Sequence, residues 1–532
     1  MITRLLVTNY RSLKNFTFRP NERLNILVGD NDAGKSSVLE VLTLALSGKI
    51  NGRWAADELN PHWFNHGVVD NFFDKLEAGE KPNAPEITIE LYFSVDTTGA
   101  ERLRGIHNSL AEDVPGLSVS VRPDPDHAAE LTQYFSQRDI PRLIPTELYI
   151  VEWRDYSNGK VTRQPAGLGH TVINASASSS SSGVDYKLRQ LLKDFVTPAE
   201  SAQISLAYRR ARASITDNAL KEVNERIHEE GASFGVGLQM DQSSSSHWAA
   251  SVTPHIENVP FELLGQGRQV MTRVALAMSR NSDRNQFVLV EEPENHLSHA
   301  NLQSLIVQIA ELAGDRQIFI TTHSSFVLNR LGFDHLYLMG ERGPRGLNTA
   351  LVTEDTISYF QRQSGYDTLR LAIAAKAVIV EGPSDEMIFN KAFEMVTGME
   401  PRAAGVDVIS LGTRGKRALE LAHSLNKKVA VLRDNDGKEP EHWRAAAAPY
   451  LQVGRREMFI GPVSDGVTLE PQMITSNSDQ TLRPILGLDA QDDVFVYMTN
   501  NKTESAWKIV NSKEQLGWPS YINEAIEFIS GI

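Results

Sequence analysis

Two groups of residues in this sequence have the types and spacing that phosphate chemistry needs. The first is residues 29–36, Gly-Asp-Asn-Asp-Ala-Gly-Lys-Ser, which satisfy the pattern G-x-x-x-x-G-K-[ST]. Glycines at these positions let the backbone turn so that its N–H groups face a polyphosphate. Lys35 then neutralises the β and γ phosphates, and the Ser36 hydroxyl is available to Mg²⁺. The pattern predicts a nucleotide-binding loop, and a chance glycine turn is the weaker alternative.

Two adjacent acids far downstream complement this loop. Glu291 and Glu292 follow the apolar residues 287–290, as at the end of a buried strand. Glu291 can hold the hydration shell of Mg²⁺, and Glu292 can polarise the attacking water. The long separation from Lys35 fits a nucleotide domain divided by an insertion, and a solvated acidic turn is the weaker alternative.

Two further features fit the same site, although each is common in proteins without such a site. Gly265 and Gly267 precede an amphipathic segment, so their amides and a helix N-terminus are available to a γ-phosphate. His323 ends an apolar strand, where its imidazole could respond to that phosphate.

The second group consists of acids in the last third of the chain. Glu381 follows the apolar residues 378–380, with Asp385 and Glu386 at the start of the next helix, and Asp434 and Asp436 follow the apolar residues 429–432. Carboxyl ends of neighbouring parallel strands converge at one edge of a sheet. Such acids repel one another unless cations neutralise them, and oxygen ligands favour Mg²⁺ or Mn²⁺. Two such ions about 4 Å apart would activate a water and stabilise the leaving oxygen of a phosphodiester.

The composition limits what else the chain can do. Its 532 residues predict three or four folding units, and 0 cysteines exclude disulfides, iron–sulfur clusters, thiol nucleophiles and Cys-ligated zinc. With 53 basic and 67 acidic residues the net charge is −14, which argues against a protein that coats nucleic acid non-specifically. Without a long apolar segment or a secretory pattern at the N-terminus, we expect a cytoplasmic protein without a membrane partner.

Hydrophobic periodicity indicates the elements that position these groups. We expect strands at residues 2–7, 24–28, 86–95 and 148–153, the last two in an antiparallel sheet, and a helix from Lys35. The serine-rich residues 176–182 predict a linker, and residues 186–230 predict helices that form either a dimerisation arm or a separate subdomain. Residues 266–333 return to helix, strand, helix, strand. A second α/β domain begins near Ala374, with strands at 377–380, 406–411, 428–432 and 494–498.

The N-terminal features together resemble the ABC-type ATPases of the RecF, SMC and Rad50 kind. The resemblance implies two ATPase units paired head to head, with ATP between the phosphate loop of one and the signature of the other. The signature here, Gly-Gln-Gly-Arg, departs from the Ser-Gly-Gly-Gln type. The residues implied in ATP binding are Gly29, Asn31, Gly34, Lys35, Ser36, Ser37, Gly265, Gly267, Glu291 and His323.

The C-terminal acids resemble the Toprim domain of topoisomerases, primases and nucleases of the OLD (overcoming lysogenization defect) family. An ATPase of the first kind followed by a Toprim domain is itself the OLD layout. The resemblance implies the metal ligands Ser36 and Glu291 in the ATPase and Glu381, Asp385, Asp434, Asp436 and Glu470 in the Toprim domain, with Glu386 an alternative to Asp385. It implies the catalytic residues Glu292, Glu381, Asp434, Asp436 and Lys502, where Lys502 neutralises charge on the phosphate.

The predicted fold class is α/β: an ABC/RecF-like P-loop ATPase domain with a helical dimerisation insertion, followed by a Rossmann-like Toprim domain. The expected domains are residues 1–170, 171–255, 256–370 and 371–532. The predicted function is an ATP-regulated, divalent-metal-dependent DNA endonuclease or nickase, with ATP, Mg²⁺ or Mn²⁺ as cofactors. Expected partners are DNA, a second copy of the chain and, by resemblance, a reverse transcriptase with its small nucleic acid or a helicase, in bacterial anti-phage defence.

Other functions remain open. The chain could be a non-nucleolytic, ATP-dependent sensor or scaffold subunit of a defence or DNA-repair complex. A topoisomerase would need a tyrosine nucleophile on a further large domain, and a primase commonly needs cysteine ligands for zinc. Basic residues that could contact DNA, although a solvated surface is their commoner role, are Arg414, Lys416, Arg417, Arg455 and Arg456.

Overall fold

The computed structural model describes residues 1–29, 32–137, 140–174, 196–230, 236–241, 248, 252–277, 285–295, 297–312, 314–324, 327, 335–340, 343–346, 351–362 and 366–531. The predicted linker at 176–182 lies outside them. The chain forms two compact units, Met1–Leu24 with Ser36–Thr321 and Asn25–Lys35 with Thr322–Ile532. Within the described residues no helix is both long and apolar enough to cross a membrane.

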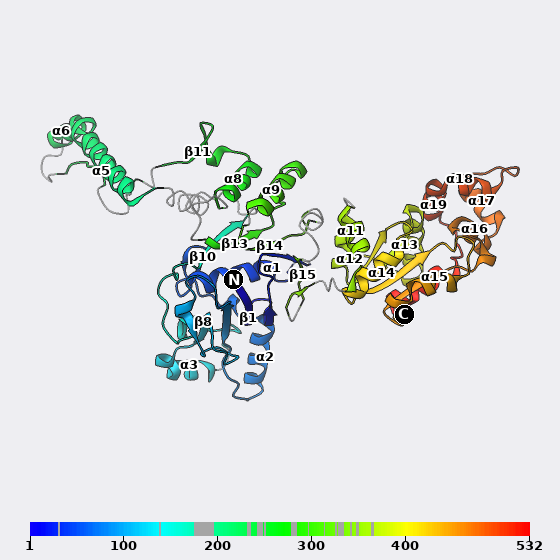
Figure 1. The fold of residues 1–532 in the computed structure, drawn as a ribbon, viewed down its shortest axis with the longest axis horizontal. Coiled ribbons are helices and arrows are strands. Elements are labelled where there is room, and N and C mark those ends of the chain that lie inside the picture. Colours follow the sequence, from blue (N-terminus) through cyan, green and yellow to red (C-terminus); the bar gives the residue numbers. More distant parts are fainter. Residues whose placement is uncertain are drawn as a thin grey trace. The chain divides into compact units, whose positions relative to one another are not determined.

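An antiparallel sheet occupies the N-terminal part of the chain (Figure 1). Its strands run in the order β2-β1-β6-β8-β7, and β9 also pairs with β8. The sheet confirms the strands that the alternation predicts at residues 86–95 and 148–153. The strands are β1 (Ile2–Tyr10), β2 (Leu13–Phe18), β6 (Ile87–Phe93), β7 (Arg104–Gly105), β8 (Val114–Pro123) and β9 (Tyr149–Asp155).

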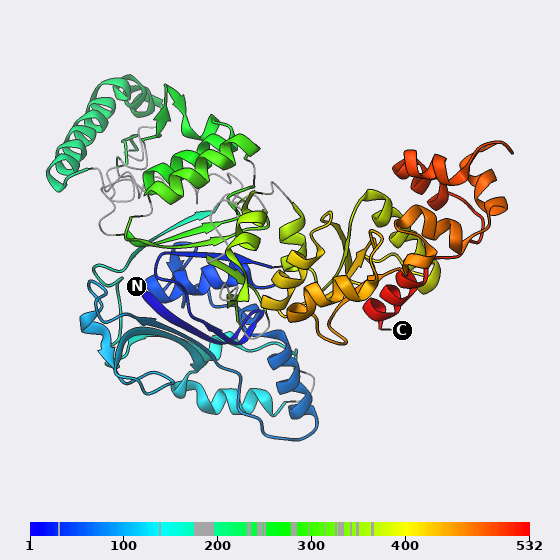
Figure 2. The same ribbon diagram turned by 45° about the vertical axis from the view of Figure 1, so that its right-hand side comes forward.

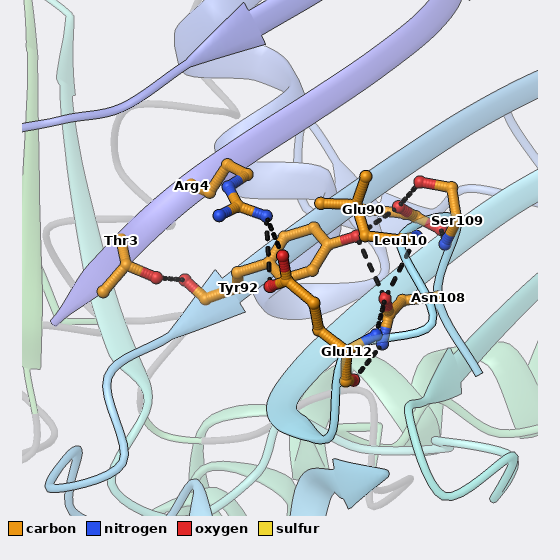
Figure 3. Close-up of polar contacts among 8 residues, drawn as sticks. All are labelled: Thr3, Arg4, Glu90, Tyr92, Asn108, Ser109, Leu110 and Glu112. Atoms are coloured by element: carbon orange, nitrogen blue, oxygen red, sulfur yellow. Dashed lines mark hydrogen bonds and ion pairs between the residues drawn. The ribbon is translucent and has the colours of Figure 1, made fainter. Parts of the chain in front are cut away.

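A polar cluster fastens the loop between β7 and β8 to this sheet (Figure 3). The buried Glu90 of β6 accepts hydrogen bonds from the Tyr92 hydroxyl and the Ser109 backbone N–H, each at 2.8 Å. Nη1 of Arg4 in β1 donates to both carboxylate oxygens of Glu112, at 3.0 and 3.1 Å. Because each of these polar groups has a partner, they hold the loop in place, which is a structural role.

The second sheet has the order β10-β13-β14-β3-β15-β16. The pairs β10–β13, β13–β14 and β3–β15 are parallel, and β15–β16 is antiparallel. Residues 287–290 of β13 are fully buried, as expected of a strand covered on both faces. The helix–strand–helix–strand order predicted for residues 266–333 is confirmed. The elements are β3 (Leu24–Val28), β10 (Gly169–Asn174), α8 (Gln266–Ala277), β13 (Asn285–Glu291), α9 (His299–Leu312), β14 (Gln317–Thr321), β15 (Leu336–Leu338) and β16 (Arg345–Gly346).

Helix α1 (Lys35–Ser47) is buried on almost every side, and Val38, Leu42 and Ala45 are fully inaccessible. A helix that is apolar all round must be covered all round. Nε1 of Trp153 in β9 donates to the carbonyl oxygen of Ala45 at 2.9 Å, which ties α1 to the antiparallel sheet. The helix ends at Gly48, with φ of 66°, and a Cβ there would lie 2.6 Å from the Trp153 ring. This turn therefore requires glycine.

Shorter elements complete the N-terminal half. Helix α2 (His66–Glu77) and helix α3 (Ala128–Phe135) contact through Phe72 and Phe135, whose ring centroids are 4.9 Å apart. Two small hairpins are β4 (Lys49–Ile50) with β5 (Arg53–Trp54) and β11 (His255–Ile256) with β12 (Val259–Pro260).

The described part of the helical insertion begins with α5 (Pro198–Ser214). It continues through a π-helical turn, Ile215–Ala219, into α6 (Lys221–Glu230). Thr197 and Glu200 form a capping box at its start. The helical character predicted for residues 186–230 is confirmed from residue 198 onward, and residues 186–195 lie outside the described residues.

The C-terminal α/β domain has a four-stranded sheet, drawn in yellow and orange in Figure 2, with the order β18-β17-β19-β20. All pairs are parallel. Chain order therefore reverses between β17 and β19, and such a switch point opens a crevice at the carboxyl ends of the two strands. The strands are β17 (Lys376–Val380), β18 (Val406–Ser410), β19 (Lys428–Arg433) and β20 (Arg456–Ile460).

Helices cover both faces of this sheet. Helices α13 and α20 share a core with the side chains of Val378, Val408 and Leu432, and helices α12 and α14 contact the sheet as a second group. The helices of this domain are α11 (Glu354–Arg362), α12 (Tyr366–Ile373), α13 (Pro383–Thr397), α14 (Gly415–Ser424), α15 (Pro440–Ala447), α16 (Leu469–Ser476), α17 (Asp479–Leu486), α18 (Val494–Asn500), α19 (Lys502–Val510) and α20 (Ser520–Ser530).

The strand predicted at residues 494–498 is wrong, because these residues form helix α18. Val494 and Met498 are each 2% exposed, while Phe495 is 48% exposed, which is the one-sided burial of a helix turn. The Asp493 side chain caps the helix by accepting from the Val496 N–H at 3.0 Å. The fourth strand is instead β20, whose sequence Arg-Glu-Met-Phe-Ile alternates poorly.

Contacts of this domain begin before residue 371. The buried carboxylate of Glu420 in α14 accepts from the Thr353 N–H and, at 2.7 Å, from the Thr356 hydroxyl. The Arg417 guanidinium lies 4.7 Å from the centroid of the Tyr359 ring in α11. Helix α11 is therefore attached to α14.

Candidate functional site

The phosphate loop lies between β3 and α1, as the pattern requires. Asp32 and Gly34 have φ of 64° and 88°, so the chain turns through the left-handed region twice. A Cβ on Gly29 would lie 2.9 Å from Cβ of Met339, which explains the glycine there. The Lys35 side chain is buried, and its Nζ donates to the Gly29 carbonyl oxygen at 3.0 Å. The Lys35 side chain therefore folds back over the loop that precedes it. Asn31 lies outside the described residues.

The start of α1 is suited to an anion. Its first turn carries no acid, so no side-chain carboxylate competes with an external anion for the positive end of the helix dipole. Ser36 is exposed at this end, whereas Ser37 is 7% exposed and faces the interior. Of the two serines, Ser36 is the one that a bound ion could reach.

The acids after β13 are held in a constrained turn. Glu292 has φ of 44°, a left-handed conformation that costs a non-glycine residue free energy and is common at functional sites. Its N–H donates to the Thr321 carbonyl oxygen at 2.9 Å, and its Oε2 accepts from Asn295 Nδ2 at 2.6 Å. The Glu291 carboxylate accepts from Asn174 of the neighbouring strand. Both carboxylates are therefore fixed by their neighbours.

An ion pair near Glu291 escaped the sequence analysis. Glu40 of α1 accepts from Arg11 Nη2 at 2.9 Å. Burial raises the pKa of Glu40, the charge of Arg11 opposes this rise, and the charge of Glu291 adds to it. Arg11 stands in a turn outside any motif considered above, so its type and spacing gave no signal.

The predicted signature and the predicted switch histidine occupy the expected elements. Gly265 and Gly267 lie at the start of α8, and His323 follows β14. A Cβ on Gly265 would meet no atom within 4 Å, so packing does not require this glycine. The buried Gln269 donates from Nε2 to the Leu264 carbonyl oxygen at 2.9 Å and closes the turn.

In the C-terminal domain, Glu381 and Asp434 stand at the ends of the two central strands. The side chain of Glu381 is 18% exposed. Oε1 of Glu381 and Oδ1 of Asp434 are both buried without a hydrogen-bond partner. Buried carboxylate oxygens without partners are costly, so these two are oriented toward something that protein groups do not supply.

The pKa values indicate which acids share this crevice. Burial, and then the charges of Asp385, Glu381 and Glu470, raise the pKa of Asp434 to about 8, while Lys502 opposes the rise. Burial, and then the charge of Glu470, raise the pKa of Asp385 to about 6, against hydrogen bonds from the backbone. Burial also raises the pKa of Glu381. Four carboxylates from separate segments therefore lie within one another's fields.

The side chains of Asp385 and Glu386 have different surroundings. Oδ2 of Asp385 accepts from the Gly382 N–H at 3.0 Å, at the start of α13 and beside the cluster. Glu386 instead lines a cavity of about 670 Å³ with Asn390 and Arg402. Of the two acids that the sequence left open, Asp385 is the one that belongs to the cluster.

Glu470 and Lys502 also come together. Glu470 in α16 has a side chain that is 5% exposed, and its Oε2 accepts from Lys502 Nζ at 3.1 Å. The Thr468 hydroxyl donates to the same oxygen at 2.7 Å. Lys502 is the first residue of α19, and the strand expected at residues 494–498 before it is helix α18. Its side chain nevertheless reaches Glu470 of the cluster.

Asn435, between the two predicted acids Asp434 and Asp436, fixes the loop that carries them. It is fully buried, and its Nδ2 donates to the carbonyl oxygens of Gly461 and Gly466 at 3.0 and 2.7 Å. Its Oδ1 accepts from the Gly437 N–H at 2.9 Å, and Asp436 itself has φ of 50°. The sequence analysis missed this residue, because its partners lie in a distant loop.

Two more residues at the cluster were missed. The Arg433 guanidinium lies 3.0 Å from Asp436 Oδ2 and 3.9 Å from Glu381 Oε1. Tyr521 of α20 is buried, and its burial, followed by the charges of Asp385 and the other acids of the cluster, raises the pKa of its hydroxyl well above the ordinary value. Neither residue belongs to a recognised spacing pattern.

These residues fit a divalent ion in their chemistry. As placed, however, no group of three or more His, Cys, Asp or Glu side chains among the described residues is arranged to hold a metal ion. Glu381 Oε1 and Asp434 Oδ1 lack hydrogen-bond partners, and neighbouring carboxylates raise the pKa of Asp434, so a cation would be stabilised here. All candidate ligands are oxygens, which favours Mg²⁺ or Mn²⁺. Asp436 is held by Arg433 in this arrangement.

The basic residues considered for DNA contact differ in their burial. Arg456 is buried, donates to the Tyr450 carbonyl oxygen at 2.9 Å and to Gln452 Oε1 at 2.6 Å, and is therefore structural. Arg414 and Lys416 are exposed in the loop after β18 and at the start of α14. These two stay available to an external anion.

Three family models match separate parts of the chain. Residues 1–107 match "AAA ATPase domain" and residues 172–329 match "AAA domain, putative AbiEii toxin, Type IV TA system". Residues 373–436 match "Overcoming lysogenization defect protein-like, TOPRIM domain". The last match includes Glu381, Asp385, Asp434 and Asp436.

Similarity also extends to one curated protein and to several solved structures. A Helicobacter pylori protein named ATP/GTP phosphatase is 22% identical over 336 residues, which cover 61% of this chain and 85% of that protein. Among solved structures, an Smc head bound to the C-winged helix domain of ScpA is 14% identical, with a TM-score of 0.35, and covers 63% of this chain and 94% of its own. RecF with ATP is 11% identical, with a TM-score of 0.32 and coverages of 65% and 97%. The C-terminal region of the Burkholderia pseudomallei OLD protein is 18% identical, with a TM-score of 0.24 and coverages of 30% and 98%. At these TM-scores no residue role is taken from the solved structures.

Proposed function

We propose that this chain, which joins AAA ATPase segments to a TOPRIM domain of the overcoming-lysogenization-defect type, is an ATP-regulated, divalent-metal-dependent DNA endonuclease or nickase. One observation carries the proposal. Acids that follow β17 and β19 gather with acids of α13 and α16 at a topological switch point, where burial and neighbouring charges raise the pKa values of Asp385 and Asp434 and two carboxylate oxygens lack hydrogen-bond partners.

In this site each side chain has a role that its surroundings support. Glu381, Asp385, Asp434, Asp436 and Glu470 would hold the metal. A bound divalent ion supplies a water of lowered pKa and stabilises charge on a phosphate. Asn435 keeps the loop of Asp434 and Asp436 in place. Lys502, which is ion-paired with Glu470 and half-exposed, would offset charge that develops on the phosphodiester.

The ATPase half would regulate access to this site. Gly29, Gly34, Lys35 and Ser36 would hold the phosphates and a magnesium ion. Glu291 would complete the hydration shell of that ion, and Glu292 would orient the attacking water. In the proposed assembly two copies pair, with Gly265 and Gly267 of one copy reaching the nucleotide of the other, and His323 would respond to the γ-phosphate. Defence against phage, with a reverse transcriptase or a helicase as partner, is part of the proposal through family resemblance.

A plasmid cleavage assay tests the proposal. Wild-type protein with Mg²⁺ or Mn²⁺ is expected to nick or linearise supercoiled plasmid, and Asp434→Ala and Glu381→Ala are expected to leave it intact. Glu386→Gln is the matched control, because this acid lies beside Asp385 in sequence but lines another cavity. Equal cleavage by wild type and Asp434→Ala would show that the activity comes from elsewhere.

A non-nucleolytic sensor or scaffold is the second candidate. It is favoured by the ion pair between Arg433 and Asp436, which satisfies one acid of the cluster without any metal. Wild-type protein that hydrolyses ATP but leaves single-stranded and duplex DNA intact with either metal, and with each candidate partner added, would support this candidate instead.

A further inference from the structure

Arg433 occupies an unusual position for a cation. It ends β19, directly before the acidic loop, and its side chain is 12% exposed. Nη2 donates to Asp436 Oδ2 at 3.0 Å, and Nη1 lies 3.9 Å from Glu381 Oε1. The guanidinium carbon lies 3.7 Å from the centroid of the Trp443 ring, and Nη1 donates to the Thr413 carbonyl oxygen at 3.2 Å. The guanidinium therefore touches two proposed metal ligands and two groups that are not ligands.

The contacts with Glu381 and Asp436 conflict with a divalent ion. A carboxylate oxygen that accepts from a guanidinium has less negative charge to offer a metal, and the two cations repel each other at this range. Metal that engages both acids must displace Arg433 from at least one of them. In the absence of other ligands, Arg433 therefore weakens metal binding.

The contacts with Trp443 and Thr413 survive such a displacement. Stacking on an aromatic ring and donation to a backbone carbonyl do not depend on the acids. The Trp443 ring is itself fixed, because its Nε1 donates to the Asn435 carbonyl oxygen at 2.9 Å. A planar fork held at the crevice in this way, whose Nη2 loses its partner when Asp436 turns to a metal, matches a phosphate oxygen.

A second cation lies on the same ring. Lys438 Nζ is 5.0 Å from the centroid of Trp443. Lys438 and Arg433 flank the loop of Asp434 and Asp436 in sequence, so a second positive charge stands beside the acids that Arg433 contacts. An anionic polymer that approaches the crevice would meet these cations at its edge.

We propose that Arg433 exchanges its carboxylate partners for a DNA phosphate when a divalent ion binds, so that metal and DNA strengthen each other's binding. The inference rests on the proposed nuclease function and adds a coupling residue to it. Because coupling is reciprocal, DNA that draws Arg433 away from Glu381 and Asp436 tightens the metal by the same factor that the metal tightens DNA.

The test compares wild-type full-length protein with Arg433→Gln. Mn²⁺ binding is measured by calorimetry without DNA, and binding of a short duplex is measured in Ca²⁺, where cleavage is not the readout. Arg433→Gln is expected to bind Mn²⁺ about three- to ten-fold more tightly and the duplex at least about three-fold more weakly. Addition of duplex should tighten Mn²⁺ binding to wild type but not to the variant.

Opposite changes in the two affinities distinguish this role from a structural one, since a misfolded variant would lose both. Arg433→Lys keeps the charge but not the fork, so it should bind Mn²⁺ as wild type does and still bind DNA more weakly. Arg414→Gln, in the exposed loop after β18, is the matched control and should leave Mn²⁺ binding unchanged.

Two other outcomes would contradict the exchange of partners by Arg433. If Arg433→Gln binds Mn²⁺ no more tightly than wild type while wild type still cleaves plasmid, the exchange is wrong and the nuclease proposal stands. If wild type binds neither Mn²⁺ nor duplex and leaves plasmid intact with every metal, both proposals fail.

Discussion

The phosphate loop and the carboxylate cluster both follow strands that have parallel neighbours, but they are built in opposite ways. The loop after β3 is a site for an anion, made of one short segment with backbone turns at Asp32 and Gly34 and a single lysine. The cluster after β17 and β19, the proposed cation site, is made of side chains from segments far apart in the sequence. A site of the first kind depends on local conformation, whereas one of the second kind depends on the whole domain being folded.

The largest effect should come from removing one acid of the cluster. Asp434→Ala is expected to lower DNA cleavage by more than about 10²-fold, since even outer-shell changes at metal sites cost up to that factor. ATP hydrolysis should stay within about two-fold of wild type, if the two sites are chemically independent. DNA cleavage kinetics and the release of phosphate from ATP, measured on the same preparation, check the two expectations. Loss of both activities together would mean that the two sites cannot be separated.

The converse substitution is Lys35→Ala. Loss of the lysine that closes on Gly29 should weaken ATP turnover by about 10²-fold, because one charged donor at a phosphate contributes on that scale. Lys49→Ala is the control, because this lysine lies over the Trp54 ring and outside the loop. If the ATPase regulates the nuclease, Lys35→Ala also changes cleavage, in a direction that shows whether ATP activates or inhibits.

Asn435→Ala probes how far the cluster depends on distant segments. The change removes the donor to the Gly461 carbonyl oxygen, whereas the Gly466 carbonyl oxygen still accepts from Gln472 Nε2 at 2.9 Å. At about 1–3 kcal/mol for one unsatisfied buried group, the free energy of unfolding should fall by about 1–3 kcal/mol. Denaturant titration followed by tryptophan fluorescence measures it, and Asn500→Ala, at the exposed end of α18, is the control. An unchanged denaturation midpoint would contradict the role given to Asn435.

The smallest effect is a dependence of stability on pH. The pKa of Asp434 in the folded protein, about 8, lies above its ordinary value of 3.8. The folded state thus favours the protonated acid, so this stabilisation is complete below pH 3.8 and is lost as the pH rises through about 8. Without metal, Asp434→Asn should raise the melting temperature at pH 8 by about 2–4 °C relative to wild type and change it less at pH 5. A larger gain at pH 5 than at pH 8 would reverse the sign and contradict the prediction.

The sequence predicted the two sites unequally, for the same reason that they differ in construction. Residues 29–36 needed only a strand before them and a helix after them, and both are present. Glu381 and Asp434 were predictable because buried parallel strands bring their carboxyl ends together. Glu470 and Lys502 came from family resemblance, since no local pattern distinguishes them from surface residues.

Other parts could not be predicted, because they depend on contacts between segments. The run at 494–498 is rich in β-branched and aromatic residues, yet tertiary burial of Val494 and Met498 makes it a helix. Asn435 and Arg433 act through Gly461, Gly466, Thr413 and Trp443, which the sequence places far from them or gives no reason to connect.

The hydrogen bond from Trp153 to Ala45 makes Trp153 an intrinsic fluorescence probe of helix α1. Because the indole is 6% exposed and bonded to the backbone of the helix whose first residue is Lys35, any axial shift of that helix must stretch or redirect the bond. Indole emission responds to such a change in its polar neighbour. If the other 6 of the chain's 7 tryptophans are replaced by phenylalanine, nucleotide occupancy could be followed in real time without any attached dye.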